Sequence, residues 1–210
     1  MTPHRSPLPS GARRIAGVDE VGRGPLAGPV VAAVVVFPAG HTDPRIKDSK
    51  QLSAKMRETL VAEIKRTALA WAIVSVGHTR IERLNIREAS RLAMSLAVAR
   101  VEADLVLVDG NVPIETPIPQ RTVVKGDQLH VEISAASILA KVFRDDLMCR
   151  LDIKYPGYGL ANHAGYGTEM HRQAIATLGP SPIHRRSFRG VKEHLALAAE
   201  TPAIVHPSHP

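Results

Sequence analysis

The chain has 210 residues, of which 44% are hydrophobic and 22% are charged, and this composition excludes a wholly disordered or fibrous protein. It carries 27 Lys and Arg residues against 20 Asp and Glu residues, and the formal net charge of +7 favours a polyanionic partner such as nucleic acid. Aromatic residues make up 3% of the chain, which argues against a single-strand-binding protein built on stacked aromatic rings.

The hydrophobic and cysteine patterns favour a soluble, cytoplasmic protein. The longest purely apolar run, residues 30–37, is far too short to cross a bilayer as a helix. The first 14 residues contain no apolar segment typical of a secretory signal. Cys149 stands alone, which excludes an internal disulfide and a cysteine-based zinc site, and we expect it to be buried within a helix.

Two strands are predicted at the beginning of the chain. Residues 14–21 form a short strand pattern that runs into a link rich in glycine and proline. The valine-rich run over 30–37 is too short and too β-branched for a helix, and it predicts a buried strand. Because the link is short, the two strands should pair antiparallel. A loop rich in turn residues follows over 38–51.

The middle of the chain alternates helices and strands. Ser53 is a predicted N-cap for a helix that ends near residue 69, and residues 71–76 predict a third strand. Thr79 and Glu82 have the spacing of a capping box, which predicts a helical region over 79–101.

The second half predicts two more strands and then helices. The continuous apolar strand over 105–108 suits a strand covered on both faces, and a further strand is predicted over 121–124. A long helix should span 134–151, and another should run from Thr168 to a stop at Gly179.

This order of elements predicts an α/β fold, with a mixed sheet that contains an antiparallel portion, flanking helices and a helical C-terminal region. We expect a flexible N-terminus over 1–13, one folded domain over 14–199, and a flexible tail over 200–210 that holds several prolines and no periodicity.

Four acidic residues fall where predicted strands end, namely Asp19, Glu20, Asp109 and Asp127. Sheet pairing could bring them together, and such carboxylates would repel one another unless a cation lay between them. Hard oxygen ligands favour Mg²⁺ or Mn²⁺, and two such ions suit phosphodiester hydrolysis. Each acid alone is better explained by turn chemistry, since Asp before Gly is favoured in turns. The pattern leaves both interpretations open.

Several other segments could contact phosphate. Gly22-Arg23-Gly24 allows close backbone approach to a ligand, although many turns have this form. Lys47 and Ser49 lie in a loop that could hold phosphate or simply be solvated, and Ser134, Ser137 and Lys141 near a helix start could bind phosphate or cap the helix.

The C-terminal region carries much of the positive charge. Residues 141–193 contain nine Lys and Arg residues against five Asp and Glu residues, which favours a surface that faces nucleic acid. His163, His171 and His184 match no recognised zinc pattern, and we expect them on the surface of this basic region.

Taken together, these strings resemble the ribonuclease HII family, the bacterial type-2 ribonucleases H. The resemblance extends from about Arg14 to Phe188. It rests on six matches in the family's order: GVDEVGRGPLAGPV from Gly17, KDSKQL from Lys47, VDGN from Val108, VKGD from Val124, ISAASILAKV from Ile133 and GYGT from Gly165.

The resemblance implies an RNase H-like fold and an endonuclease that hydrolyses RNA in RNA–DNA hybrids and leaves 5′-phosphate ends. It also implies incision on the 5′ side of a single ribonucleotide embedded in duplex DNA, as in ribonucleotide excision repair. The cofactor would be Mg²⁺ or Mn²⁺, used in a two-metal mechanism. The implied ligands are the four acids Asp19, Glu20, Asp109 and Asp127.

The resemblance also implies substrate contacts. Gly22, Arg23 and Gly24 would contact the 2′-OH and the adjoining phosphate, and Tyr166 would pack on the sugar just 3′ of the ribonucleotide. The implied phosphate contacts are Lys47, Ser49, Ser137 and Lys141. Many members carry Lys before the GYGT string, whereas this chain has His163 and Ala164 there, so the phosphate contact of that lysine is not carried over to this chain.

The expected partners are RNA–DNA hybrid and ribonucleotide-containing duplex DNA, with no membrane. We expect a monomer, and the sequence indicates no protein partner and no obvious clamp-binding peptide in its tail. Two alternatives remain at this point: a catalytically silent hybrid- or duplex-RNA-binding module, and a metal-dependent DNA endonuclease such as a junction resolvase.

Overall fold

The structure, a computed structural model, describes residues 11–46 and 52–195. The chain separates into two compact units, of which the first comprises residues 1–23 and 29–147 and the second comprises 24–28 and 148–210. Lys47, Ser49, most of the predicted N-terminal segment and the whole predicted tail lie outside the described residues, so the predicted domain boundaries stay predictions.

The first unit is built on the two strands predicted at the start of the chain. β1 (Arg14–Val21) and β2 (Val30–Pro38) pair antiparallel, with Val18 opposite Val34. Every residue of β2 except Pro38 is buried, which explains why its sequence is apolar without alternation. The predicted strand pair is confirmed.

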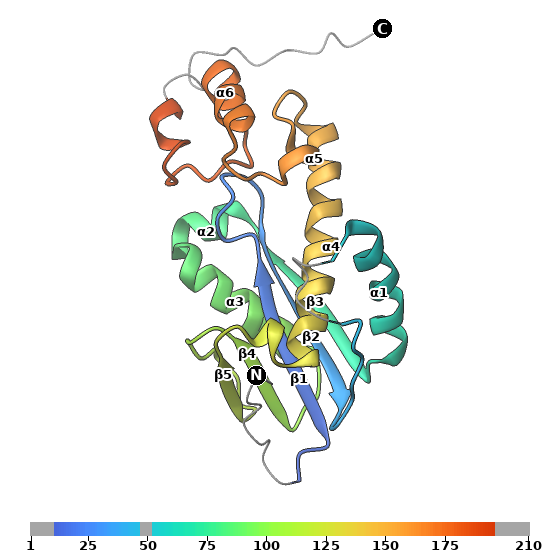
Figure 1. Ribbon diagram of the computed structural model, residues 1–210. Coiled ribbons are helices and arrows are strands. Elements are labelled where there is room, and N and C mark those ends of the chain that lie inside the picture. Colours follow the sequence, from blue (N-terminus) through green and yellow to red (C-terminus); the bar gives the residue numbers. More distant parts are fainter. Residues whose placement is uncertain (1–10, 47–51, 196–210) are drawn as a thin grey trace, which may run out of the picture. The chain divides into compact units, whose positions relative to one another are not determined.

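Five strands form one mixed sheet in the order β3-β2-β1-β4-β5 (Figure 1). The remaining strands are β3 (Ala70–Val76), β4 (Leu105–Asp109) and β5 (Gln120–Val123). β1 occupies the centre, antiparallel to β2 and parallel to β4, and β4 is parallel to β5. The predicted mixed sheet with an antiparallel portion is therefore confirmed.

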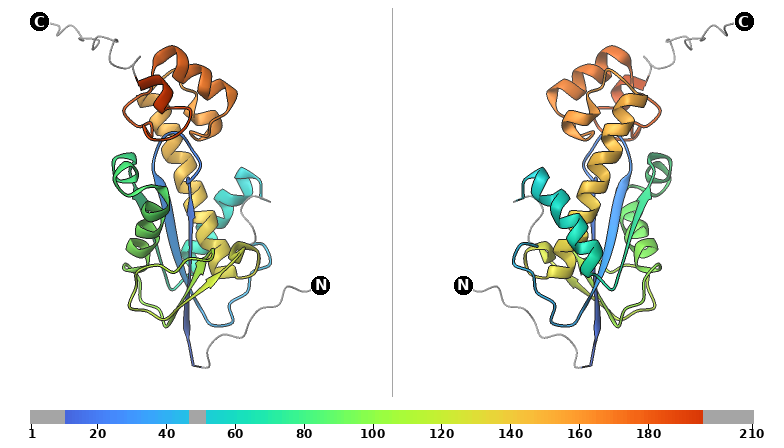
Figure 2. Two further views of the ribbon diagram at one scale, coloured as in Figure 1. Left: turned by 90° about the vertical axis from the view of Figure 1, so that its left-hand side faces the viewer. Right: turned by 90° about the vertical axis from the view of Figure 1, so that its right-hand side faces the viewer.

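Helices cover both faces of the sheet, as Figure 2 shows with the sheet seen from its edges. α1 (Ala54–Thr67) and α4 (Val131–Lys154) lie on one side, and α3 (Ile86–Val98) lies on the other, against β1, β2 and β3. Leu60 of α1 and Ile138 of α4 pack into one apolar core with alternate residues of β2. Ser53 caps α1 as predicted, by accepting a hydrogen bond from the backbone N–H of Met56.

The contact between β1 and α4 depends on a glycine. A Cβ atom on Gly17 would overlap the backbone of Glu132 and Ile133 at the start of α4. Only a residue without a side chain lets the helix lie this close to the central strand. The close approach brings Ser137 of α4 to the carboxyl end of β1.

The helical region predicted over 79–101 is two helices. α2 (His78–Leu84) and α3 are separated by Asn85, whose φ of +67° ends the first helix. The Asn85 side chain then caps α3 by accepting hydrogen bonds from Arg87 N and Glu88 N. The predicted capping box at Thr79 is wrong, because Gly77 is the N-cap residue of α2 and Asn85 has the capping role for α3.

The second unit is helical, as predicted for the C-terminal region. It contains α5 (Leu160–His163), α6 (Glu169–Leu178) and the short 3₁₀ helix η3 (Lys192–His194), and the unit boundary falls within α4. Leu26 and Ala27 of the inserted segment share an apolar core with Leu160 and Ile175. Cys149 is exposed on α4, so the expectation that it is buried is wrong. None of the described helices is long and apolar enough to cross a membrane.

Candidate active site

Two acidic residues lie at the ends of neighbouring parallel strands. Val18 of β1 is opposite Val108 of β4, so the next residues, Asp19 and Asp109, stand side by side. Strand ends are rigid platforms because the sheet fixes the backbone that precedes them. The structure thus brings together two carboxylates that are distant in the sequence.

Asp19 is held in a setting that disfavours its charge. The side chain is 7% exposed. It accepts hydrogen bonds from the backbone N–H of Glu20 at 2.7 Å and from the Ser137 hydroxyl. Burial, and then the carboxylates of Glu20 and Asp109, nevertheless raise the pKa of Asp19 well above its usual range.

Glu20 points to the opposite face of β1 from Asp19, because successive side chains alternate along a strand. Its carboxylate pairs with the Arg23 guanidinium at 3.3 Å. Burial raises the pKa of Glu20; Arg23 counteracts this effect, and the nearby Asp109 carboxylate adds to it. The ionised forms of Asp19 and Glu20 are therefore both energetically unfavourable in the metal-free protein.

The loop after β5 holds Asp109 from the other side. The backbone N–H of Gly126 donates to the Asp109 carboxylate at 2.7 Å. Gly126 begins the short 3₁₀ helix η2 (Gly126–Gln128), and the next residue, Asp127, is buried. Asp127 lines a separate pocket together with His130, whereas Glu20 and Asp109 line a common one. Asp127 therefore follows the residue that is hydrogen-bonded to Asp109, but its side chain lines a different pocket.

The donor chemistry of these acids fits a hard divalent cation. Within residues 11–46 and 52–195, no three His, Cys, Asp or Glu side chains are already gathered in the arrangement that holds an ion. The carboxylates of Glu20 and Asp109 nevertheless make ionisation of Asp19 unfavourable, Asp109 does the same for Glu20, and a cation among them would remove this repulsion. Carboxylate oxygens are the ligands that Mg²⁺ and Mn²⁺ prefer.

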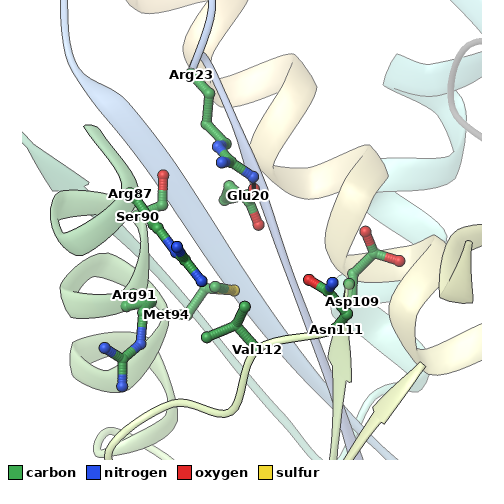
Figure 3. Close-up of a pocket in the computed structure, with 10 residues that line it drawn as sticks. Glu20, Arg23, Arg87, Ser90, Arg91, Met94, Asp109, Asn111 and Val112 are labelled. Carbon is green, nitrogen blue, oxygen red and sulfur yellow. Dashed lines mark hydrogen bonds and ion pairs between the residues drawn. The ribbon is translucent and has the colours of Figure 1, made fainter. Parts of the chain in front are cut away.

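A pocket of about 350 Å³ opens beside Glu20 and Asp109 (Figure 3). Arg87, Ser90 and Arg91 of α3 form its opposite wall. The Ser90 hydroxyl is one of two buried side-chain polar atoms in the described part of the chain that lack a hydrogen-bond partner. Sequence reasoning missed these α3 residues; Arg87 and Arg91, four apart and therefore on one helix face, were the available signal.

The predicted phosphate contacts have different settings. Ser137 is buried and donates to Asp19, which makes it a support for that acid in this structure. Lys141 forms an ion pair with Asp145, one helical turn later, at 2.8 Å. Lys47 and Ser49 lie outside the described residues. A phosphate contact by any of these four side chains stays a prediction.

The Gly-Arg-Gly loop has a structural reason for its first glycine. Gly22 adopts a φ of +91°, and a Cβ atom there would overlap the buried side chain of Arg144. Within the second unit, Gly24 lies against the Tyr166 ring, since a Cβ atom on Gly24 would be 3.6 Å from Tyr166 Cε1. Tyr166 is 42% exposed, so its ring remains accessible to a ligand.

His163, His171 and His184 lie in the second unit and are not surface residues. His171 and His184 are almost completely buried, and His163 is partly buried. They contact one another and are hydrogen-bonded to backbone groups. The expectation that they lie on the surface is wrong, because residues 148–195 build a core of their own in which these rings take part.

The ribonuclease HII family model matches residues 16–191. The chain belongs to the ribonuclease HII family. A ribonuclease HII from Syntrophotalea carbinolica is 52% identical over 187 residues, which cover 88% of this chain and 90% of that protein. A ribonuclease HII from Geobacter sulfurreducens is also 52% identical, over 88% of this chain and 86% of the relative.

Solved structures agree with the family assignment. The ribonuclease H2 from Pyrococcus horikoshii has a TM-score of 0.75 and 25% identity, over 90% of this chain and 100% of that one. The ribonuclease HII of Archaeoglobus fulgidus, solved in a complex with PCNA, has a TM-score of 0.71 and 26% identity, over 83% and 95%. Bst-RNase HIII in complex with Mn²⁺ has a TM-score of 0.64 and 20% identity, over 90% and 71%, a likeness that shows the fold alone.

Membership in the family establishes the class of protein. The chain is a hydrolase with the fold and the activity type of the ribonucleases H, whose type-2 members act on RNA–DNA substrates. Of the classes left open by the sequence, the enzyme is therefore favoured over the silent binding module, and the ribonuclease over the junction resolvase.

Proposed function

We propose that this ribonuclease hydrolyses the RNA strand of RNA–DNA hybrids and cuts on the 5′ side of single ribonucleotides embedded in duplex DNA, leaving 5′-phosphates, with Mg²⁺ or Mn²⁺ as cofactor. One observation carries the proposal. In a member of this family, the buried Asp19 and the part-buried Asp109 repel each other at the ends of two parallel strands, beside a pocket that Arg87 lines on its opposite side.

The proposed ligands of two divalent ions are Asp19, Glu20, Asp109 and Asp127. When bound, such ions lower the pKa of an attacking water and stabilise the leaving oxygen. The protein holds the carboxylates in fixed orientations, since Ser137 donates to Asp19 and Gly126 donates to Asp109. Fixed ligands avoid the cost of reorganisation when the reaction occurs.

Recognition of the ribonucleotide is assigned to the Gly22-Arg23-Gly24 loop and to Tyr166. The backbone groups of the loop and the half-exposed Arg23 are suited to a 2′-OH and its adjoining phosphate. The ring of Tyr166, exposed beside Gly24, offers an apolar face to the neighbouring sugar. A 2′-OH is what distinguishes RNA from DNA at one position, so the loop would supply strand selection.

The α3 wall of the pocket extends this substrate surface. Arg87 presents positive charge opposite the acids, where a phosphodiester backbone would otherwise be repelled, whereas the Arg91 guanidinium is paired with Glu88 at 2.8 Å. We assign Arg87 to binding of the nucleic-acid backbone.

The proposal sets the enzyme in the cytoplasm as a monomer that incises DNA at misincorporated ribonucleotides, the first step of ribonucleotide excision repair. Its substrates are RNA–DNA hybrid and ribonucleotide-containing duplex DNA. The basic composition of residues 141–193 suits such polyanions.

Incubation of the purified protein with end-labelled duplexes tests the proposal. The substrates are a duplex with one ribonucleotide, the same duplex in all-DNA form, and a continuous hybrid, each with EDTA, Mg²⁺ or Mn²⁺. We expect a cut on the 5′ side of the ribonucleotide only with metal, and an intact all-DNA duplex.

The matched control is Asp109→Asn, which keeps an oxygen that can accept from Gly126 N–H but removes the charge. We expect it to fold normally and to lose turnover. Binding without cleavage by the wild type in Mn²⁺ would identify a silent module, and cleavage of branched all-DNA substrates would identify a resolvase. Either result overturns the proposal.

A further inference from the structure

Three histidine rings form a connected cluster inside the second unit. His163 ends α5, His171 lies in the first turn of α6, and His184 follows α6. The rings of His163 and His171 stack with centroids 4.4 Å apart, and those of His171 and His184 are 5.2 Å apart. His171 is 0% exposed and His184 is 1% exposed, so the hydrogen bonds of the cluster are made away from water.

Backbone donors determine where the protons of two rings lie. The backbone N–H of Ser181 can only donate, and it points to His184 Nδ1 at 2.9 Å. A neutral His184 therefore carries its proton on Nε2 and donates it to His171 Nε2 at 3.1 Å. His171 in turn carries its proton on Nδ1 and donates it to the carbonyl of Tyr166 at 2.9 Å.

The third ring is fixed in the same way. The backbone N–H of Gly165 donates to His163 Nδ1 at 3.2 Å. His163 therefore holds its proton on Nε2 and donates it to the carbonyl of Tyr158 at 3.0 Å. In this arrangement each stacked ring has one donating and one accepting nitrogen, and a second proton on His171 would break the hydrogen bond that it accepts from His184.

These bonds converge on the backbone of Tyr166. Its N–H donates to the carbonyl of His163 at 2.9 Å, and its carbonyl accepts from His171 and from Thr168 N–H at 2.8 Å. The preceding residue is held as well, because the Gly165 carbonyl accepts from Leu26 N–H at 2.8 Å. The Tyr166 carbonyl is therefore held by the buried His171 ring, and the peptide group before Tyr166 is held by backbone groups of His163 and Leu26.

The environment keeps His171 neutral. Burial lowers its pKa to about 4, with His163 and Arg172 acting in the same direction and the backbone hydrogen bonds at Tyr166 and Gly165 opposing them. The charged and titratable groups around it are His163 from α5, Arg172 from its own helix and His184 from the following segment. The network is thus stable in one protonation pattern at neutral pH.

We propose that the cluster of His163, His171 and His184 positions Tyr166 and thereby sets the selectivity of the enzyme for single ribonucleotides. The proposal rests on the proposed function, since it takes Tyr166 as a contact of the sugar 3′ of the ribonucleotide. The histidines act through the Tyr166 backbone and are positioning residues. A displacement of about 1 Å in such a contact can cost up to a hundredfold in rate.

The first test measures the position of Tyr166 without substrate. The chain has three tyrosines, so 3-fluorotyrosine labelling should give three ¹⁹F resonances, and Tyr166→Phe identifies the one of interest. His171→Leu removes the donor to Tyr166, whereas His171→Asn keeps an N–H near the place of Nδ1. Gln173→Leu, at an exposed position of the same helix, is the matched control. We expect the Tyr166 resonance to move in His171→Leu only.

The second test measures kcat and KM on a single-ribonucleotide duplex and on a continuous hybrid. His171→Leu should lower kcat/KM about tenfold on the former, mainly through kcat, and no more than about twofold on the latter. His171→Asn should recover most of the loss. In a background of Tyr166→Ala, His171→Leu should cause no additional loss, because both changes remove the same contact.

The outcomes separate this inference from the proposed function. An unmoved Tyr166 resonance in His171→Leu, equal losses on both substrates, or losses that add in the double variant overturn the positioning role. If Tyr166→Ala alone leaves kcat/KM unchanged on both substrates, the assumed contact between Tyr166 and the substrate is wrong. The ¹⁹F resonance of Tyr166 still decides whether the histidine cluster holds this residue in place. If His171→Leu does not fold, Ser181→Ala replaces it in both tests. This change removes only the hydroxyl that lies 2.8 Å from His184 Nδ1, and we expect the same effects at smaller size.

Discussion

Replacement of Asp19 by Asn should stabilise the metal-free protein while it abolishes activity. Asp19 is buried, and its charge is opposed by burial and by the carboxylates of Glu20 and Asp109. Asn has the same shape and can still accept from Glu20 N–H, so the main change is the loss of a repelled charge. Sites built to bind a cation are expected to trade stability for function in this way.

The magnitude follows from the local setting. Relief of one unfavourable charge is commonly worth ~1 kcal/mol, which raises the melting temperature of a chain of this length by about 2–4 °C. Saturation with Mn²⁺ at a hundred times its dissociation constant should stabilise the wild type by ~2.7 kcal/mol. The variant should gain much less, so the order of the two melting temperatures should reverse when metal is added. Turnover should fall at least about a hundredfold, since even second-layer changes at metal sites can cost that much.

Differential scanning calorimetry in EDTA and in Mn²⁺ measures both effects. Asp104→Asn is the matched contrast, because the Asp104 carboxylate accepts from Arg13 N–H, Arg14 N–H and the Arg14 side chain, which lower its pKa. Neutralising that acid should lower the melting temperature. If Asp19→Asn also melts lower than the wild type in EDTA, Asp19 is a structural acid and the reasoning about a repelled charge is refuted.

Gly17→Ala should lower the free energy of unfolding by ~3 kcal/mol, since its Cβ would overlap the backbone of Glu132. Urea unfolding measures this change. A decrease of less than about 0.5 kcal/mol, the size of a neutral surface substitution, would contradict the close packing of α4 against β1. Arg87→Gln should weaken substrate binding and reduce the slope of log affinity against log salt by about 1, whereas Arg66→Gln on exposed α1 should leave the slope unchanged; equal slopes in both variants would remove Arg87 from the interface. His171 in the folded protein stays unprotonated down to about pH 4, whereas His171 in the unfolded chain takes up a proton below about pH 6.5. The free energy of unfolding should therefore be fully retained above pH 6.5 and fall by ~3 kcal/mol towards pH 4. Urea titrations at several pH values measure this decrease, which His171→Asn should lack.

Much of the fold could be predicted from local patterns. The run over 30–37 is apolar without alternation because both faces of β2 are covered, and the signal was readable as a buried strand. Ser53, Thr168 and Gly179 mark helix ends where they were predicted, because caps are satisfied by residues next to them in the chain. The break at Asn85 was missed, since a single residue with positive φ leaves the apolar periodicity on either side intact.

Much less of the candidate site than of the fold could be predicted from the sequence. Each acid could be placed at the end of a predicted strand, but only the register of β1 against β4 puts Asp19 beside Asp109. The sequence contained no sign that Asp127 would line another pocket or that Ser137 would donate to Asp19, because both depend on how α4 packs against the sheet.

By itself, then, the order of residues determined the elements, the class of fold and, through its six matched strings, the family, because these properties depend on neighbours along the chain and on motif order. Only the tertiary structure decided which side chains meet and which are removed from water. His163, His171 and His184 illustrate the difference: they match no zinc pattern and were expected on the surface of a basic region, and the fold instead buries His171 and His184 and partly buries His163. Burial and long-range contact are properties of the whole packed chain, and no local pattern contains them.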